Sequence, residues 1–311
     1  MFRKKKIWIS VDGGGTEARF CACNENNELL FNKSYGSTNY KTASYQVAKD
    51  NLTQGIVDLV ETLEIERHEI IGTVVGVSGC DTEEDKKVYI KILKDLEFLC
   101  DRFYVCNDTE LAFRAISNTK GLCVVAGTGS IVTAYDDNQL VDRVGGWGSP
   151  LSDLGSGYWI GAQILSKLIR WLDGMNEDKL PIYDDIVDQY SYSNEVLQWR
   201  LSKLSTNEVA AISELVFSYA NSGNLVCKNI VKSSAMHISD LIISAYSKAN
   251  FDGVCTIVTV GGLFKDPLYL SSVKSQVMRS LGQESLRFLI ASKSPAEEGL
   301  KYARKRFQQS S

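Results

Sequence analysis

The sequence has very little of the residue types that build metal sites and disordered segments. It contains only two histidines, His68 and His237, and its eight cysteines include no Cys-x-x-Cys pair. A structural zinc site needs such ligands at short spacing, so none is expected. Only 4 of the 311 residues are proline and no low-complexity tract occurs, which predicts an ordered globular chain.

Long apolar runs and a basic excess are also missing. The first apolar run, Ile7–Val11, is ended by Asp12 and is too short for a signal-peptide core or a membrane span. With no export signal, the cysteines are expected to be reduced thiols of a cytoplasmic protein without a membrane partner. The formal net charge of −4 argues against a nucleic-acid partner, and the length predicts two domains.

Two segments of the chain begin with the same pattern. Each shows an apolar strand, a glycine loop with a hydroxyl residue, a returning strand and a third strand after a polar turn. The repeat predicts an internal duplication and a ligand cleft between the two halves. Strands are expected at 6–11, 18–23, 29–35, 70–77, 103–106, 122–125, 131–135, 140–144 and 256–260. Helices are expected at 44–63, 82–96, 109–116, 158–172, 208–221, 225–247 and 296–307.

The two glycine loops are candidates for phosphate binding. They read Asp12-Gly13-Gly14-Gly15-Thr16 and Ala126-Gly127-Thr128-Gly129-Ser130. Consecutive glycines let successive backbone N–H groups point at one anion. Each loop leads into a strand and not into a helix, which excludes a P-loop and a dinucleotide fingerprint. A single loop of this kind is equally well a hairpin turn, but two at equivalent places favour a ligand that carries phosphates.

These loops resemble the first and second phosphate loops of the actin-like ATPase superfamily of sugar kinases, chaperone ATPases and actin. Gly261-Gly262 after an apolar strand resembles the adenosine motif of that superfamily. Gly145-Gly146-Trp147-Gly148 and the segment Asp153–Gly161 resemble the N-acetylglucosamine kinases and their BadF-type ATPase relatives. The resemblance covers nearly the whole chain.

The resemblance implies an α/β fold of two ribonuclease H-like (actin-like ATPase) domains with a ligand cleft between them. The first domain would span residues 1–118 and be completed by a C-terminal helix at 291–311. The second domain would span residues 119–290. Relatives of this type are often homodimers, which sets the same expectation here.

The resemblance also implies roles for individual residues. Asp12 would serve Mg²⁺ beside the phosphates of ATP. Asp108, at the end of a strand, would be the catalytic base that takes the proton of the attacking hydroxyl, although an aspartate there is also an ordinary helix cap. The residues expected to bind the nucleotide are Gly13, Gly14, Gly15, Thr16, Gly127, Thr128, Gly129, Ser130, Gly261 and Gly262. The residues expected to contact the sugar are Asn39, Ser78, Asp108, Thr128, Gly146, Trp147 and Asp153.

The implied activity is ATP-dependent phosphorylation of an amino sugar, N-acetylglucosamine first, at a hydroxyl expected to be O6. Leu154 departs from the family pattern, which has a carboxylate at this place, so glucosamine and N-acetylmuramic acid stay open as substrates. Two functions of other classes also stay open. One is an ATPase activator of a dehydratase, which bridges an iron–sulfur cluster through cysteines, and the other is a sugar sensor without catalysis.

Overall fold

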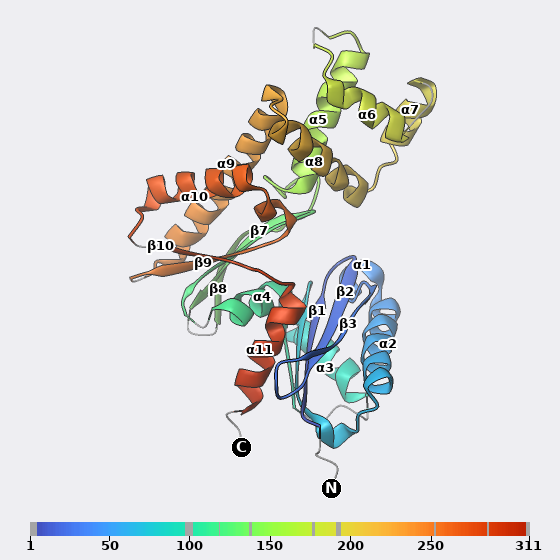
Figure 1. Ribbon diagram of the computed structural model, residues 1–311, viewed down its shortest axis with the longest axis vertical. Coiled ribbons are helices and arrows are strands. Elements are labelled where there is room, and N and C mark those ends of the chain that lie inside the picture. Colours follow the sequence, from blue (N-terminus) through green and yellow to red (C-terminus); the bar gives the residue numbers. More distant parts are fainter. Residues whose placement is uncertain are drawn as a thin grey trace. The chain divides into compact units, whose positions relative to one another are not determined.

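The computed structural model describes residues 5–96, 102–117, 119–136, 139–175, 178–190, 194–251, 253–284 and 286–308. The chain divides into two compact units, one of Met1–Asn118 with Ala291–Ser311 and one of Thr119–Ile290 (Figure 1). Each unit is built on its own mixed sheet of five strands. In the described part of the chain, no helix is long and apolar enough to cross a membrane.

The first unit holds a sheet in the order β3-β2-β1-β4-β5. Strands β1 and β2 form the antiparallel hairpin of the first glycine loop, while β4 and β5 continue from β1 in parallel. The strands are β1 (Ile7–Gly13), β2 (Glu17–Cys23), β3 (Leu29–Gly36), β4 (Ile70–Val77) and β5 (Phe103–Asn107). The helical segments are α1 (Tyr40–Ala43), α2 (Tyr45–Leu63), a 3₁₀ turn at Arg67–Glu69, α3 (Glu83–Lys94), α4 (Asp108–Ile116) and α11 (Pro295–Gln308).

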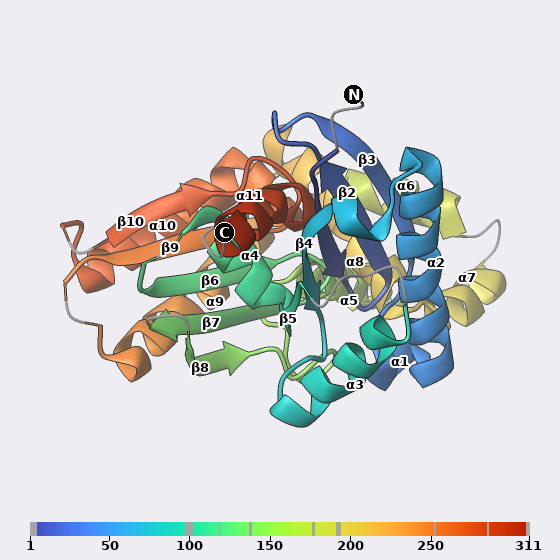
Figure 2. The ribbon, with the colours of Figure 1, turned by 90° about the horizontal axis from the view of Figure 1, so that it is seen from below.

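Helices cover both faces of this sheet. Strand side chains alternate, so Ile9 of β1 faces α2 and α3 while its neighbour Trp8 faces the other side. On that other side, Leu111 of α4 and Leu300 of α11 complete a second, smaller core with Trp8. Figure 2 shows the sheet between these two pairs of helices. The last helix of the chain therefore belongs to the unit that begins it.

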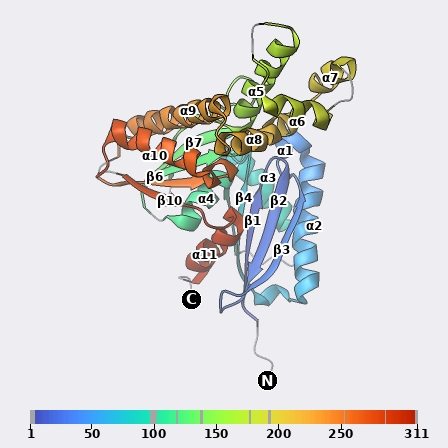
Figure 3. The same ribbon diagram turned by 45° about the horizontal axis from the view of Figure 1, so that its top comes forward.

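The second unit repeats the strand order, as β8-β7-β6-β9-β10 read from the corresponding edge. Its helices α5, α8, α9 and α10 share one large core with the sheet (Figure 3). The strands are β6 (Gly121–Ala126), β7 (Ser130–Asp136), β8 (Gln139–Gly145), β9 (Cys255–Val260) and β10 (Leu286–Ile290). The helices are α5 (Gly157–Leu172), α6 (Pro181–Tyr190), α7 (Asn194–Leu201), α8 (Thr206–Asn221), α9 (Leu225–Ala249), a 3₁₀ turn at Gly262–Lys265, and α10 (Pro267–Leu281).

The two five-stranded sheets with flanking helices confirm the α/β fold class that the resemblance implied, and their shared strand order agrees with the predicted duplication. In both units an antiparallel hairpin carries the glycine loop, and a parallel strand pairs with the first strand of that hairpin. The expected strands and long helices are present, with ends within about two residues of those expected. Helices α6 and α7 form a part of the second unit for which the sequence had suggested no separate elements.

Candidate active site

The first glycine loop is held tightly at its base and is open at its tip. The carbonyl of Gly13 accepts the N–H of Ser78 at 2.7 Å, which ties the loop to the end of β4. A Cβ on Gly13 would lie 2.2 Å from Thr38 Oγ1, so only glycine fits there. Gly15 and Thr16, by contrast, are exposed at the tip of the hairpin. The backbone can therefore approach a ligand closely at this point.

Two carboxylates lie at the same end of the first sheet. Asp12 pairs in register with Gly76 of β4, and Asp108 follows directly after β5. Because β1, β4 and β5 are parallel, their carboxyl ends meet at one edge. Burial raises the pKa of Asp12 to about 7, and the negative charge of Asp108 adds to the shift.

Asp108 is the first residue of α4, and its neighbour Asn107 is the cap. The side chain of Asn107 accepts the N–H of Thr109 at 2.9 Å and the Thr109 hydroxyl at 2.7 Å. The ordinary capping role is thus filled without Asp108. Burial raises the pKa of Asp108 to about 6, against the hydrogen bond from the Thr109 N–H, and the charge of Asp81 adds to the rise.

Asn39 and Ser78, both expected to contact sugar, lie next to each other. Asn39 caps α1 by accepting the N–H of Lys41 at 3.0 Å, and its amide donates to Ser78 Oγ at 3.3 Å. Gly79 has a φ of 81°, and a Cβ there would lie 2.7 Å from Asn39 Oδ1. The tight turn after β4 therefore brings the Asn39 amide and the Ser78 hydroxyl side by side.

A charged cluster beside these residues was not expected from the sequence. Lys41 Nζ lies 3.2 Å from Asp81 Oδ2 and 2.8 Å from Asp85 Oδ2. Asp81 Oδ1 in turn accepts the amide of Asn107 at 3.1 Å. The cluster holds the side chain of Asn107, the residue before Asp108. In the sequence, the only sign of this cluster is the Ser78-Gly79 turn that precedes Asp81.

The second glycine loop is bound to the start of α5. The carbonyl of Gly127 accepts the N–H of Gly157 at 2.7 Å, and that of Thr128 accepts the N–H of Tyr158 at 3.1 Å. Ser156 caps the same helix by accepting the N–H of Trp159 at 3.1 Å. The loop and the N-terminus of α5 therefore form one rigid element.

Asp153 supports the second loop from behind. Its carboxylate is 7% exposed and accepts the N–H of Ser130 at 3.2 Å and the hydroxyl of Ser149 at 2.8 Å. Asp153 has a φ of 59°, in the left-handed region, where aspartate is among the better tolerated residues. A Cβ on Gly129 would lie 3.1 Å from this carboxylate, so the contact depends on glycine in the loop.

Gly146 and Trp147 lie at the end of β8, next to the same loop. The N–H of Gly146 donates to the carbonyl of Ser130 at 3.0 Å. Trp147 is 77% exposed, and the guanidinium of Arg143 lies 4.9 Å from the centre of its ring. The indole is thus held on one side by a cation and is otherwise open.

A cavity of about 670 Å³ in the second unit joins the second glycine loop to the Gly261-Gly262 turn. Gly261 has a φ of 115°, and a Cβ there would lie 2.2 Å from the carbonyl oxygen of Ala126. Helix α8 forms one wall with residues that the sequence did not single out. The lining residues include Gly127, Thr128, Asn207, Ala210, Ala211, Glu214, Phe217, Gly262 and Lys265.

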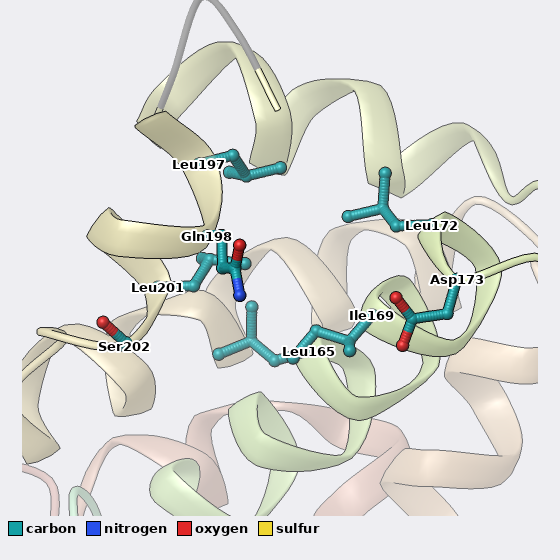
Figure 4. Close-up of a pocket in the computed structure, with 8 residues that line it drawn as sticks. All are labelled: Leu165, Ile169, Leu172, Asp173, Leu197, Gln198, Leu201 and Ser202. Carbon is teal, nitrogen blue, oxygen red and sulfur yellow. The ribbon is translucent and has the colours of Figure 1, made fainter. Parts of the chain in front are cut away.

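A separate cavity of about 500 Å³ lies in the second unit between α5 and α7 (Figure 4). Figure 4 shows its mainly aliphatic wall, with Asp173, Gln198 and Ser202 as polar members. None of the expected site residues lines it. In the described ranges no cluster of three or more His, Cys, Asp or Glu side chains is placed to hold a metal ion.

The expected residues thus form two groups, each within one unit. The model of the BadF/BadG/BcrA/BcrD ATPase family matches residues 9–298. The chain belongs to this family. Membership of an ATPase family implies that the chain uses ATP.

Among the relatives of this BadF-family chain is the N-acetylmuramic acid/N-acetylglucosamine kinase of Clostridium acetobutylicum. It is 27% identical over 272 residues, covering 85% of this chain and 88% of that protein. The N-acetyl-D-glucosamine kinase of Dictyostelium discoideum is also 27% identical, over 80% of this chain and 82% of that protein. The fold matches a candidate N-acetylglucosamine kinase of Porphyromonas gingivalis with a TM-score of 0.74 at 16% identity, over 96% and 99% of the two chains.

Proposed function

We propose that the protein is an ATP-dependent amino-sugar kinase that phosphorylates O6 of N-acetylglucosamine or a close derivative. The observation that carries the proposal is Asp108, a carboxylate at the start of α4 with its pKa raised to about 6. A group that titrates near neutrality can accept the proton of a sugar hydroxyl at physiological pH. The names of the two 27% identical relatives, both sugar kinases, support the same reaction.

In this reaction the sugar oxygen attacks the γ-phosphorus of ATP. A new bond forms between that oxygen and phosphorus, while the bond from phosphorus to the β–γ bridging oxygen breaks and ADP leaves. The hydroxyl proton passes to Asp108. Both glycine loops hold the phosphates by backbone N–H groups, which stabilises charge on the transferred group.

Asp12 has the chemistry required to hold a magnesium ion. Among the described residues its carboxylate accepts no hydrogen bond, and burial together with the charge of Asp108 raises its pKa to about 7 against the opposing charge of Arg19. Mg²⁺ is commonly held by one or two carboxylates together with phosphate oxygens and water. When bound, the ion would neutralise phosphate charge, and Asp12 would be its protein ligand.

The cavity beside α8 is the proposed site of the adenosine of ATP. Its volume suits a nucleoside, and Gly127 and Thr128 of the second loop lie at its edge, where the phosphates would begin. On the sugar side, we assign Asn39, Ser78, Thr128, Gly146 and Trp147 as contacts. Asp153 has its two oxygens engaged by Ser130 and Ser149, so its first role is to hold the loop.

The proposal is tested by ADP release with ATP and Mg²⁺ against N-acetylglucosamine, glucosamine, N-acetylmuramic acid, N-acetylmannosamine and glucose. ADP release that depends on one amino sugar supports it. Equal ADP release with and without sugar would favour an ATPase, and sugar binding without turnover would favour a sensor. The proposal includes a homodimer, which sedimentation of the purified protein would test, and a cytoplasmic location, which cell fractionation would test.

The dehydratase-activator alternative is weakened by the cysteines. A bridging iron–sulfur cluster needs accessible thiolates, but the seven cysteines in the described part of the chain are all buried. Burial raises the pKa of Cys21, Cys80 and Cys255 to about 12, which keeps these thiols protonated. Cys100 lies outside the described residues. A purified protein that contains iron would revive this alternative.

A further inference from the structure

No anion in the described part of the chain is paired with the side chain of Arg143. It lies on β8 opposite Thr133 of β7, and its guanidinium lies 4.9 Å from the centre of the Trp147 ring. Within the described ranges that guanidinium makes no ion pair or hydrogen bond. The preceding residue, Asp142, does have a partner of opposite charge, because its Oδ1 lies 3.4 Å from Lys248 Nζ. A guanidinium offers five N–H donors, so Arg143 can still bind a carboxylate.

The loop that follows Arg143 carries almost no negative charge. In residues 143–156 the only charged side chains are Arg143 and Asp153. Both oxygens of Asp153 already accept hydrogen bonds, from Ser130 N–H and Ser149 Oγ–H. An anionic group near Trp147 would therefore meet one unpaired cation and one carboxylate turned toward its own loop.

Large apolar side chains are exposed along the same loop. Leu151 is 93% exposed, Leu154 is 43% exposed and Trp147 is 77% exposed. Three large apolar groups exposed along one short loop are more than scattered surface residues, and they suggest contact with a ligand that has an apolar part.

We propose that Arg143 and Trp147 form a subsite for a carboxylate-bearing substituent of the sugar, so that an acidic amino sugar is the preferred substrate. This inference rests on the proposed kinase function. The matching probe is N-acetylmuramic acid, whose 3-O-lactyl group joins a carboxylate to a methyl group. The guanidinium pairs with the carboxylate, and the exposed Trp147 and leucine side chains pack on the methyl and on the sugar C–H groups.

A purely structural role for Arg143 makes a different prediction. If the guanidinium only supports the Trp147 ring, its loss lowers kcat/KM for neutral and acidic sugars alike. If it binds the carboxylate, its loss acts on the acidic sugar selectively. The ratio of kcat/KM for N-acetylmuramic acid to kcat/KM for N-acetylglucosamine separates the two roles.

The experiment measures both kcat/KM values for the wild type, Arg143→Gln, Arg143→Lys and the control Lys248→Gln. Lys248→Gln removes a cation of the same unit that is already paired with Asp142. We expect the ratio to fall about 10- to 100-fold in Arg143→Gln, the size of one lost charge-assisted contact. Arg143→Lys should have a ratio between those of the wild type and Arg143→Gln, and Lys248→Gln should have the wild-type ratio. Added salt should raise KM for the acidic sugar more than for the neutral one.

Three results would overturn the inference. A wild type that phosphorylates N-acetylglucosamine but not N-acetylmuramic acid removes the subsite and leaves the kinase proposal intact. An equal loss on both sugars in Arg143→Gln reduces Arg143 to a support for Trp147. If no sugar is phosphorylated and calorimetry detects no binding of N-acetylmuramic acid, the kinase proposal and the inference both fail.

Discussion

The carboxylate of Asp153 accepts the backbone N–H of Ser130 at 3.2 Å, although 23 positions separate the two residues in the chain. The bond joins the second glycine loop to the segment that follows Trp147. A change at Asp153 should therefore also alter the loop that we propose to hold phosphate.

Substitutions of Asp153 should separate its loop-holding role from a direct role toward sugar. Asp153→Asn keeps an oxygen for Ser130 N–H and tolerates the left-handed backbone, so we expect KM for ATP to stay within about threefold. Asp153→Ala leaves the buried N–H unpaired and should raise KM for ATP about 10- to 100-fold. The measurement is steady-state kinetics with both substrates varied. Equal effects of the two variants, confined to KM for sugar, would place the carboxylate on the substrate instead.

Asp108→Asn should remove the base and preserve the shape of the site. We expect kcat to fall about 10²- to 10⁴-fold, while the affinities for ATP and sugar, measured by calorimetry, change little. Helix α4 should remain intact, because Asn107 caps it independently. Turnover near the wild-type value in this variant would remove Asp108 from its catalytic role.

The pH dependence of the reaction should follow the same carboxylate. Asp108 must be ionised to accept a proton, and its pKa is raised to about 6. We therefore expect kcat/KM to decline as the pH falls through about 6, and to be level from about pH 7 to 8. The residual activity of Asp108→Asn should lack this decline. A wild-type profile that stays level down to pH 5 would contradict the assignment.

The substitution Asp12→Asn should raise the stability of the protein and lower its activity. Its pKa rises from 3.8 in the unfolded chain to about 7 in the folded state, so the folded state binds more protons between these values. The free energy of unfolding then decreases as the pH rises from about 4 to 7. Without Mg²⁺, Asp12→Asn should raise the free energy of unfolding at pH 8 by about 1–3 kcal/mol.

Denaturant titration at pH 8 and pH 4 measures this effect, and the gain should shrink at pH 4. The surface variant Asp240→Asn on α9 is the control and should show no such difference. Asp12→Asn should also lose activity that depends on Mg²⁺. A variant that is less stable than the wild type at pH 8 would show that the carboxylate is compensated in the folded protein.

The wall formed by α8 should control nucleotide affinity. Ala211 is exposed and lines the cavity, so Ala211→Phe would place a ring in the proposed adenosine site. We expect KM for ATP to rise at least about tenfold, as for a loss of one or two kcal/mol of contacts, with KM for sugar nearly unchanged. Ser218→Phe, exposed on the same helix but outside the cavity, is the matched control. Equal KM values for ATP in Ala211→Phe and Ser218→Phe would show that the adenosine does not bind in this cavity.

The sequence was sufficient for the strands and the glycine loops, because short β-branched runs and consecutive glycines are local signals. It was not sufficient for the wall at Ala211 and Glu214, which is brought to the second loop by packing of α8. It also did not distinguish Asn107 from Asp108 at the start of α4, since either can cap a helix. Lys41 and Asp81 meet across 40 positions, a contact that only the tertiary fold creates.

The position of α11 in the first unit has a consequence for the order in which the two units fold during synthesis. Residues 119–290 form one continuous unit, which can fold as soon as it has been synthesised. The first unit cannot, because Leu300 and Ala303 of α11 complete the core around Trp8. Gly299 allows this closure, since a Cβ there would lie 2.2 Å from Ser10 Oγ. The first unit, although its synthesis begins first, therefore completes its folding after the second unit. Until α11 has been made, the core side chains around Trp8 stay exposed, and chaperones would bind the first unit in that state.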